Sequence, residues 1–222
     1  PRPALSPDGS TLVYETEKSP GDVDLFSLRV GGYNPVNLTA DHAGYDGAAS
    51  FSPDGTTLAF RSDRDGGGLF LMGATGESPR RLTTFGYQPA WFPDGRHIVF
   101  STASFLEPEY RYGMGTLFTV ELPAGDPVKL FDASDGFDAT LPRVSPSGRW
   151  IACGGGPRRR RGYGIYTLPA KGLAAGVDPA LVYHSETRDV AWAPFWSADG
   201  ARLFFGSESD GSRNLWSVPI DE

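Results

Sequence analysis

Apolar and polar residues alternate along most of this chain, in short runs that end at Gly, Pro, Asp or Ser. Two apolar residues stand two positions apart in each of five runs: Leu12 and Tyr14, Leu58 and Phe60, Ile98 and Phe100, Ile151 and Cys153, and Leu203 and Phe205. Residues two apart lie on one face of a β-strand, whereas a helix places residues three or four apart on one face. The pattern therefore predicts a protein built from β-strands.

The turns before these strands form a repeat. Five copies read LSPDG, FSPDG, WFPDG, VSPSG and WSADG, and they end at Gly9, Gly55, Gly95, Gly148 and Gly200. These glycines are about 40 to 53 residues apart, a period typical of proteins in which one small antiparallel sheet is repeated. We expect the aspartate of each turn, or Ser147 in the fourth copy, to accept backbone hydrogen bonds, and the glycine to supply positive φ.

Each copy predicts further strands around its turn. Strand A precedes the turn and strand B follows it. Strand C is a Leu-aromatic-x-aliphatic run, at residues 25–28, 69–72, 117–120, 165–168 and 215–218. Strand D begins at Val36, Arg80, Val128 and Ala180, and the fifth copy lacks it. We expect an all-β, five-bladed β-propeller of four-stranded antiparallel blades. Residues 1–222 would form a single domain with repeats at approximately 1–39, 44–83, 86–131, 138–183 and 188–222.

Composition narrows the classes of partner. The net charge is −7, which argues against a nucleic-acid partner because phosphate backbones attract basic surfaces. No apolar stretch is long enough to cross a bilayer, so we expect no membrane insertion. The single cysteine, Cys153, excludes an internal disulfide and stands in the aromatic column of strand B, where a buried structural thiol is expected.

The residues from Ala49 to Thr83 carry a family resemblance. They read ASFSPDG, then LAFRSDRDGG, then LFLMGATGESPRRLT, and they resemble the WD-like β-propeller repeat of TolB and its relatives. The resemblance covers essentially the whole chain. It implies a scaffold that binds a protein partner, and it favours a periplasmic or extracellular compartment, with a cytoplasmic one as the alternative. Known TolB propellers have six blades, so a six-bladed ring with one blade missing or incomplete is the alternative to five blades.

Antiparallel pairing of strands A to D gives every blade two unlike ends. The A–B turns and C–D loops lie at one end, the turn end, and the longer B–C and D–A loops lie at the other, the loop end. Long loops that vary in length commonly bind partners, and aromatic residues and arginine are typical of binding surfaces. Our candidate binding residues at the loop end are Tyr45, Asp46, Tyr87, Glu109, Tyr110, Arg111, Tyr112, Asp138, Arg159, Arg160 and Arg188.

Simpler interpretations exist for parts of this set. The segment with Glu109 to Tyr112 could pack on its own blade, and the run Arg158 to Arg161 could be a solvated charged loop. A metal site formed by His42 and His184 with Asp46 or Glu186 is a weaker alternative, because nothing in the spacing requires it.

Signatures of enzyme chemistry are missing from the sequence. It contains no Gly-x-Ser-x-Gly, His-Glu-x-x-His or Cys-x-x-Cys motif and no phosphate-binding glycine loop before a helix. We therefore expect a non-enzymatic binding module without a cofactor, whose partner is a protein or peptide, with a small molecule or glycan as the alternative ligand. Similar repeats occur in propeller domains of peptidases and hydrolases and in receptor-kinase sensors. A substrate-gating accessory domain or an extracytoplasmic sensor domain is therefore the alternative function.

Overall fold

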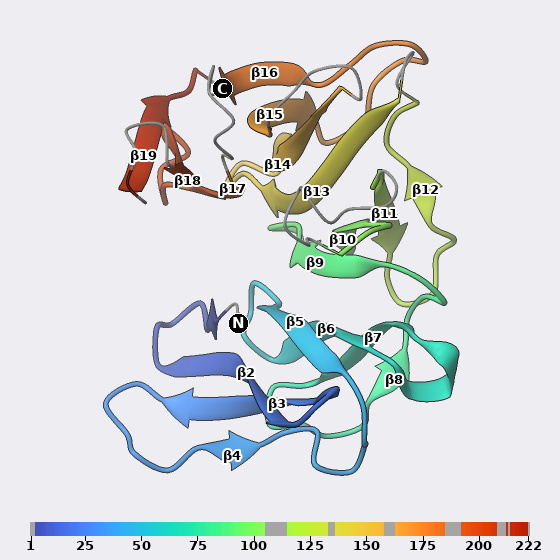
Figure 1. Cartoon of the computed structure of the whole chain (residues 1–222), viewed down its shortest axis with the longest axis vertical. Coiled ribbons are helices and arrows are strands. Elements are labelled where there is room, and N and C mark those ends of the chain that lie inside the picture. The colour runs from blue at the N-terminus through green and yellow to red at the C-terminus, as the bar shows by residue number, and fades with distance from the viewer. Residues whose placement is uncertain are drawn as a thin grey trace. The chain divides into compact units, whose positions relative to one another are not determined.

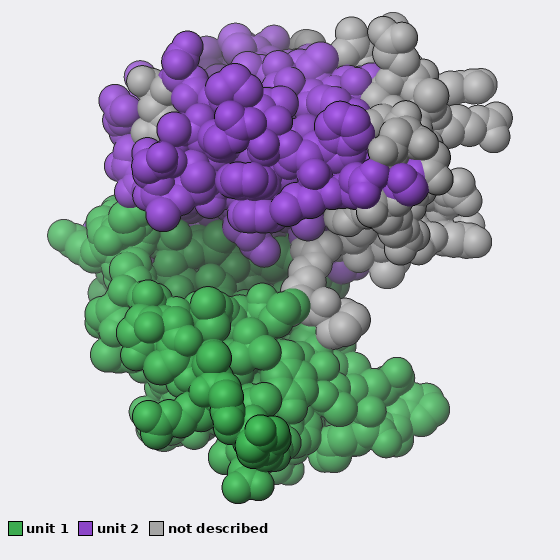
Figure 2. Space-filling view, turned by 90° about the vertical axis from the view of Figure 1, so that its left-hand side faces the viewer, with its two compact units in different colours: residues 1–98, 122–125 green, residues 99–121, 126–222 purple. Residues whose placement is uncertain are grey.

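A computed structural model describes residues 3–104, 115–132, 136–157, 163–184, 192–207, 212 and 214–221 (Figure 1). The chain divides into two compact units, which Figure 2 colours separately. Unit 1 comprises residues 1–98 and 122–125, and unit 2 comprises residues 99–121 and 126–222. The candidate residues Glu109, Tyr110, Arg111, Tyr112, Arg159, Arg160 and Arg188 lie outside the described residues.

Five antiparallel sheets make up the fold, and each sheet contains strands that are consecutive in the chain. Blade 1 consists of β1 (Ala4–Leu5), β2 (Thr11–Ser19), β3 (Asp22–Arg29) and β4 (Val36–Asn37). Blade 2 consists of β5 (Asp46–Phe51), β6 (Thr57–Ser62), β7 (Gly68–Gly73) and β8 (Arg80–Arg81). Blade 3 consists of β9 (Tyr87–Trp91), β10 (His97–Ser101), β11 (Leu117–Glu121) and β12 (Val128–Lys129). Blade 4 consists of β13 (Phe137–Val144), β14 (Trp150–Pro157), β15 (Gly164–Pro169) and β16 (Ala180–His184). Blade 5 consists of β17 (Trp192–Trp196), β18 (Arg202–Ser207) and β19 (Asn214–Pro219).

These sheets confirm the predicted fold class, an all-β five-bladed propeller. The fifth blade has three strands in the described ranges, as its sequence predicts. In the described part of the chain, helical structure is limited to one 3₁₀ turn, η1 (Arg64–Gly66), and no helix there is long and apolar enough to span a membrane.

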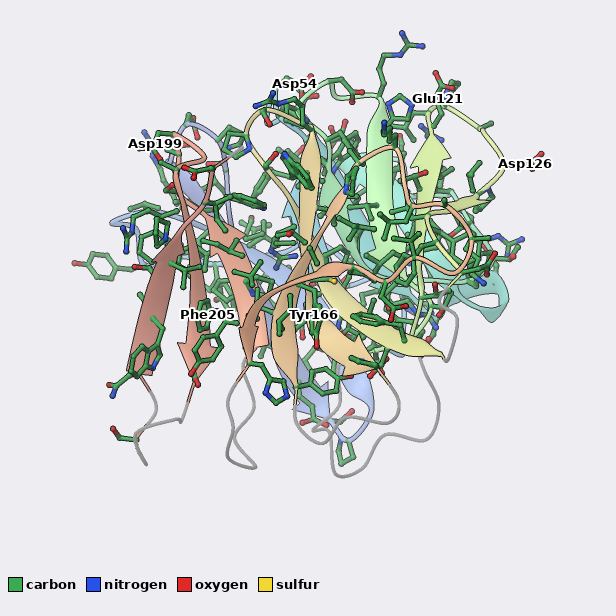
Figure 3. All side chains as sticks on the ribbon, turned by 90° about the horizontal axis from the view of Figure 1, so that it is seen from above. Asp54, Glu121, Asp126, Tyr166, Asp199 and Phe205 are labelled. Atoms are coloured by element: carbon green, nitrogen blue, oxygen red, sulfur yellow. The ribbon has the colours of Figure 1, made fainter. Side chains whose placement is uncertain are left out.

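The Pro-Asp-Gly turns have the predicted local structure. In blade 1, Oδ1 of Asp8 accepts hydrogen bonds from the Ser10 amide at 3.0 Å and from the Ser6 hydroxyl at 2.6 Å, while the Ser6 Oγ accepts one from the Thr11 amide at 2.9 Å. Gly9 has φ 71°. The same pattern recurs at Asp54 and Asp199. In Figure 3, Asp199 lies at the turn end of blade 5, and Phe205 lies further along β18.

The third turn differs because Phe92 replaces the serine. Asp94 there accepts hydrogen bonds from the amide of Arg96 at 2.8 Å and from Nδ1 of His97 at 2.6 Å. The His97 ring also packs edge-on against Phe92, with the ring centroids 5.9 Å apart. In this copy the His97 ring nitrogen therefore donates to the aspartate of the turn, as a serine hydroxyl does at Asp8, Asp54 and Asp199.

Apolar contacts between consecutive blades form the core. In unit 1, Val13 and Leu25 of blade 1 pack against Leu58, Phe60 and Phe70 of blade 2. In unit 2, the corresponding residues Ala152 and Ile165 of blade 4 pack against Leu203 and Phe205 of blade 5. The central strands are therefore buried on both faces, and most of the hydrophobic stabilisation lies between sheets.

The A strands of blades 2 to 5 share a bulge that the sequence does not predict. Three residues before the end of β5, β9, β13 and β17 stands a residue with φ between 52° and 58°: Ala48, Gln88, Leu141 and Ala193. The pairing register with strand B shifts at this point in blades 2, 4 and 5. A non-glycine residue in this conformation costs on the order of 1 kcal/mol. The bulge changes the direction of the strand just where it leaves the loop end.

Candidate functional site

The loop end of unit 1 holds a cluster of charged and aromatic side chains built on Asp46. Asp46 is the first residue of β5 and is fully buried. Its Oδ2 accepts a hydrogen bond from Nη2 of Arg64 at 3.0 Å and lies 3.2 Å from Nδ1 of His42. Arg64 begins η1, in the B–C loop of blade 2, and His42 lies in the D–A loop before β5. The buried carboxylate therefore connects two loops that are separate in sequence.

Arg64 also contacts an exposed carboxylate. Its Nη1 and Nη2 donate hydrogen bonds to the two oxygens of Asp41 at 3.3 and 3.2 Å, and the Asp41 side chain is 67% exposed. Burial alone would lower the pKa of Arg64, but the hydrogen bonds to Asp46 and Asp41 raise the pKa above its ordinary value. The guanidinium thus stays charged, and the Arg64 side chain, which is 11% exposed, bridges the buried Asp46 and the exposed Asp41.

A second arginine, in the strand that leads into this loop, is held against an aromatic ring. The guanidinium carbon of Arg61, in β6, lies 5.0 Å from the ring centroid of Tyr87, the first residue of β9. Nη2 of Arg61 donates to Asp63 at 2.8 Å, and Nη1 donates to the carbonyl oxygens of Gly68 and Ser62. A cation positioned over an aromatic face is attracted by the ring quadrupole. Blades 2 and 3 therefore meet at the loop end through a partly buried Arg–Tyr pair.

Tyr45 completes this surface. Its carbonyl oxygen accepts a hydrogen bond from the amide of Asp63 at 3.0 Å, and Tyr45 forms a parallel bridge with Val23 of β3. A Cβ at Gly47 would lie only 2.4 Å from the Tyr45 hydroxyl oxygen. The tyrosine ring can fold back over the strand only because residue 47 has no side chain.

A further buried acid lies in the neighbouring blade of unit 1. Asp24 of β3 is fully buried and contacts Nζ of Lys18 at 2.8 Å and Nδ2 of Asn37 at 2.6 Å. Burial by itself would raise the pKa of Asp24, but the hydrogen bonds from Lys18 and Asn37 keep it below the usual value. Blade 1 is therefore braced by a charged network of its own, separate from the one at Asp46.

The structure thus brings together three of the predicted site residues, Tyr45, Asp46 and Tyr87, in unit 1. Asp138 belongs to unit 2, where its Oδ1 accepts a hydrogen bond from the Gly115 amide at 2.7 Å. The sequence did not single out Arg61 and Arg64 as site residues. Arg64 lies within the segment SDRDGGG and Arg61 directly precedes it. The mixture of arginine with Asp63 and Asp65 was the sequence feature that could have indicated a charged site there.

The chemistry of this cluster suits recognition through charged and aromatic contacts. In the described part of the chain, no three His, Cys, Asp or Glu side chains gather as a metal site. Nδ1 of His42 lies 3.2 Å from Oδ2 of Asp46, while Glu186 lies outside the described residues.

Comparisons with known proteins agree with this architecture. The family model of the TolB β-propeller domain matches residues 2–152. Curated proteins gave no match. Among solved structures, a protein described as TolB from Agrobacterium tumefaciens has a TM-score of 0.76 at 22% identity, over 98% of this chain and 76% of its own. TolB from Acinetobacter baumannii has a TM-score of 0.73 at 18% identity, over 100% of this chain and 54% of its own.

Propellers attached to enzymes are similar as well. A prolyl endopeptidase has a TM-score of 0.59 at 13% identity, over 99% of this chain and 34% of its own. At these identities the solved structures show a shared fold, whereas the family model matches about two thirds of the sequence itself. The chain therefore belongs to the family of TolB β-propeller domains.

Proposed function

We propose that this chain is a binding module that holds a protein or peptide partner at the loop end of its blades, and that the contact surface in unit 1 centres on Arg61, Arg64 and Tyr87. The observation that carries the proposal is the pair of arginines, each held by an aspartate of the chain, with the Arg61 guanidinium over the ring of the partly buried Tyr87. Tyr and Arg are among the residues that contribute most to protein interfaces, and side chains held in place lose less entropy on binding.

Asp46 has a positioning role in this proposal. Because it is fully buried, it acts on a partner only through Arg64 and His42. Arg64 and the exposed Asp41 offer both a positive and a negative group to the partner. A peptide with mixed charge and at least one aromatic or arginine side chain fits this surface best.

A library of random peptides displayed on phage and selected on the intact chain tests the proposal. Selected peptides are then titrated against Tyr87→Ala and against Tyr33→Ala, a matched control. Tyr33 is a tyrosine that is 94% exposed in the C–D loop of blade 1, at the turn end. We expect Tyr87→Ala to weaken binding about tenfold or more, as is typical for an interface tyrosine, and Tyr33→Ala to leave it unchanged. Peptides that bind equally well to Tyr87→Ala would contradict the proposal.

The second candidate function is an accessory propeller of a larger enzyme, such as a peptidase or a hydrolase acting on polysaccharides. It is supported by the likeness to the prolyl endopeptidase, in which this chain matches about a third of the length. The coding sequence of the intact natural protein distinguishes the two candidates. A catalytic domain in the same polypeptide supports the accessory role, and a propeller with only a short additional domain supports the binding module.

A further inference from the structure

Unit 1 contains a pocket of about 500 Å³ at the turn end, where blades 1 and 2 meet. Its walls are the A–B turns and the C–D segments of these two blades, and Asp54, which Figure 3 labels, is one of its residues. The apolar cluster with Val13, Leu25 and Phe60 joins the same two blades. The pocket therefore lies within one compact unit, between two sheets that pack directly on each other. Its volume is in the range of small-ligand sites in proteins, about 300 to 1,000 Å³.

Strand β3 of blade 1 supplies the polar wall of this pocket. Leu25, Ser27 and Arg29 are alternate residues of β3, so their side chains share one face of the strand. Leu25 is fully buried in the contact with blade 2, Ser27 is partly buried, and Arg29 is exposed. The face thus changes from apolar to polar as the strand approaches the turn end, and Ser27 and Arg29 line the pocket there.

The polar residues of this wall are particular to blade 1. Residues 25–39 align without a gap with residues 69–83 of blade 2, and both segments end in Leu-Thr. Three polar pocket residues of blade 1 stand where blade 2 has a different residue: Ser27 in place of Leu71, Arg29 in place of Gly73 and Asn34 in place of Ser78. In blade 2 the Glu77 carboxylate leaves no room for a side chain at Gly73, whereas the equivalent Tyr33 of blade 1 is 94% exposed. Because blade 2 folds without these three residues, the blade structure itself does not require them.

Several polar groups that line the pocket have hydrogen-bonding capacity to spare. The Arg29 guanidinium, the Asn34 amide and the Ser27 hydroxyl form no hydrogen bond or ion pair within the described part of the chain. Oδ1 of Asp54 accepts hydrogen bonds from its own turn, whereas its Oδ2 accepts none from the described residues. The pocket thus offers both donors and acceptors to a ligand.

The charges around the pocket favour a neutral ligand. Asp8 and Asp54 belong to the two turns that line it, and hydrogen bonds, above all from Ser6 and Ser52, lower the pKa of both carboxyls. Both aspartates are therefore ionised at neutral pH, and they would repel an anion that approached Arg29. A cation would be repelled by Arg29, and both oxygens of Asp8 already accept hydrogen bonds from their own turn.

We propose that this pocket binds a neutral saccharide, as a second ligand site at the end of the blades opposite to the surface centred on Tyr87. Each hydroxyl of a sugar can both donate and accept hydrogen bonds, so one ring can accept from Arg29 and Asn34 and donate to Asp54. The ring also has an apolar C–H face, which fits the carbon surface of the partly buried Phe51 in the same pocket. A small apolar surface with a few converging polar groups is typical of small-molecule sites.

Saturation-transfer difference NMR on the intact chain tests the proposal. The probes are the methyl glycosides of glucose, galactose, mannose and N-acetylglucosamine, each at about 10 mM, because a ligand with so few atoms binds a polar pocket in the millimolar range. Glucuronate and Nα-acetyl-lysine methylamide serve as the anionic and cationic comparison probes. We expect signals from at least one neutral glycoside, and weaker signals from both charged probes.

Variants of the polar wall assign the signals to the pocket. Arg29→Ala should weaken glycoside binding about tenfold and Asn34→Ala about threefold, the factors expected for the loss of a charged and of a neutral hydrogen-bond partner. Ser27→Leu introduces the residue type that blade 2 has at this position and should abolish binding by filling the pocket. Arg80→Ala is the matched control, because Arg80 is an exposed arginine of β8 that does not line the pocket. Unchanged urea midpoints verify that the variants fold.

Three results would overturn the proposal. Glycoside signals that persist in both Arg29→Ala and Ser27→Leu would place the sugar elsewhere on the chain. Signals from the lysine derivative or from glucuronate alone would identify a basic peptide or an anion as the occupant. Silence from all the neutral glycosides would show that the pocket takes no sugar.

Discussion

Replacing Asp46 by alanine tests the assignment of this residue as the buried anchor of the loop end. The substitution removes the partner of the Arg64 Nη2 at 3.0 Å and of the His42 Nδ1 at 3.2 Å, and it leaves a small cavity at a fully buried position. Breaking a buried ion pair by removing one partner costs about 3 to 5 kcal/mol. Arg64 keeps its contact with the exposed Asp41, so we expect a loss of about 2 to 3 kcal/mol in the free energy of unfolding.

Urea unfolding followed by tryptophan fluorescence measures this loss, and Asp41→Ala is the matched control. Asp41 pairs with the same guanidinium but is 67% exposed, so its removal should cost about 0 to 1 kcal/mol. Adding Arg64→Met to Asp46→Ala should recover part of the stability, because the buried charge is then no longer left unpaired. If Asp46→Ala and Asp41→Ala destabilise the chain equally, Asp46 is not the anchor and the argument for a preorganised Arg64 fails.

Three further predictions concern the repeat itself. Gly55→Val should lower the free energy of unfolding by more than ~1 kcal/mol, because Gly55 has φ 74°; an unchanged urea midpoint would show that this turn tolerates a side chain. Hydrogen bonds from Ser6 and Ser10 lower the pKa of Asp8 from 3.8 to about 2, so its stabilising contribution is present above about pH 4 and is lost as pH falls toward 2. Thermal unfolding of Asp8→Ala should accordingly depend less on pH in this window than that of the unmodified chain, and identical slopes would refute the assignment. Cys153 should resist alkylation in the native chain at pH 8 and react fully in urea, because burial raises its thiol pKa to about 12; rapid native labelling would place it at the surface.

The fold was predictable because its information is local and repeated. A Ser-Pro-Asp-Gly turn satisfies its own hydrogen bonds within six residues, as Ser6, Asp8 and Thr11 do, so the same four residues give the same structure in blades 1 and 2. The alternation after each turn then places Leu and Phe on one face of strand B. Five consistent copies leave little room for another interpretation, and the fourth copy shows that Ser147 can replace aspartate, since its Oγ accepts the Arg149 amide at 3.2 Å.

The candidate site was predictable only in part. The sequence placed Tyr45, Asp46 and Tyr87 at the loop end from topology, and the structure brings them together there. It did not pair Asp46 with Arg64, because the two residues are 18 positions apart and meet only through the register of β5 on β6. The predicted residues of the longest loops lie outside the described residues, and their role at the loop end remains a proposal.

The A-strand bulge had no sequence signal. Ala48, Gln88, Leu141 and Ala193 adopt positive φ without being glycine, because pairing with strand B on both sides of the bulge holds them there.

By itself, the sequence determined the strand pattern, the turn chemistry, the number of blades and the family, because these depend on contacts between residues close together in the chain. The tertiary structure decided which charges are buried and which arginine stacks on which tyrosine. Those properties depend on the packing of one sheet against the next, and residues far apart in sequence meet only when that packing forms.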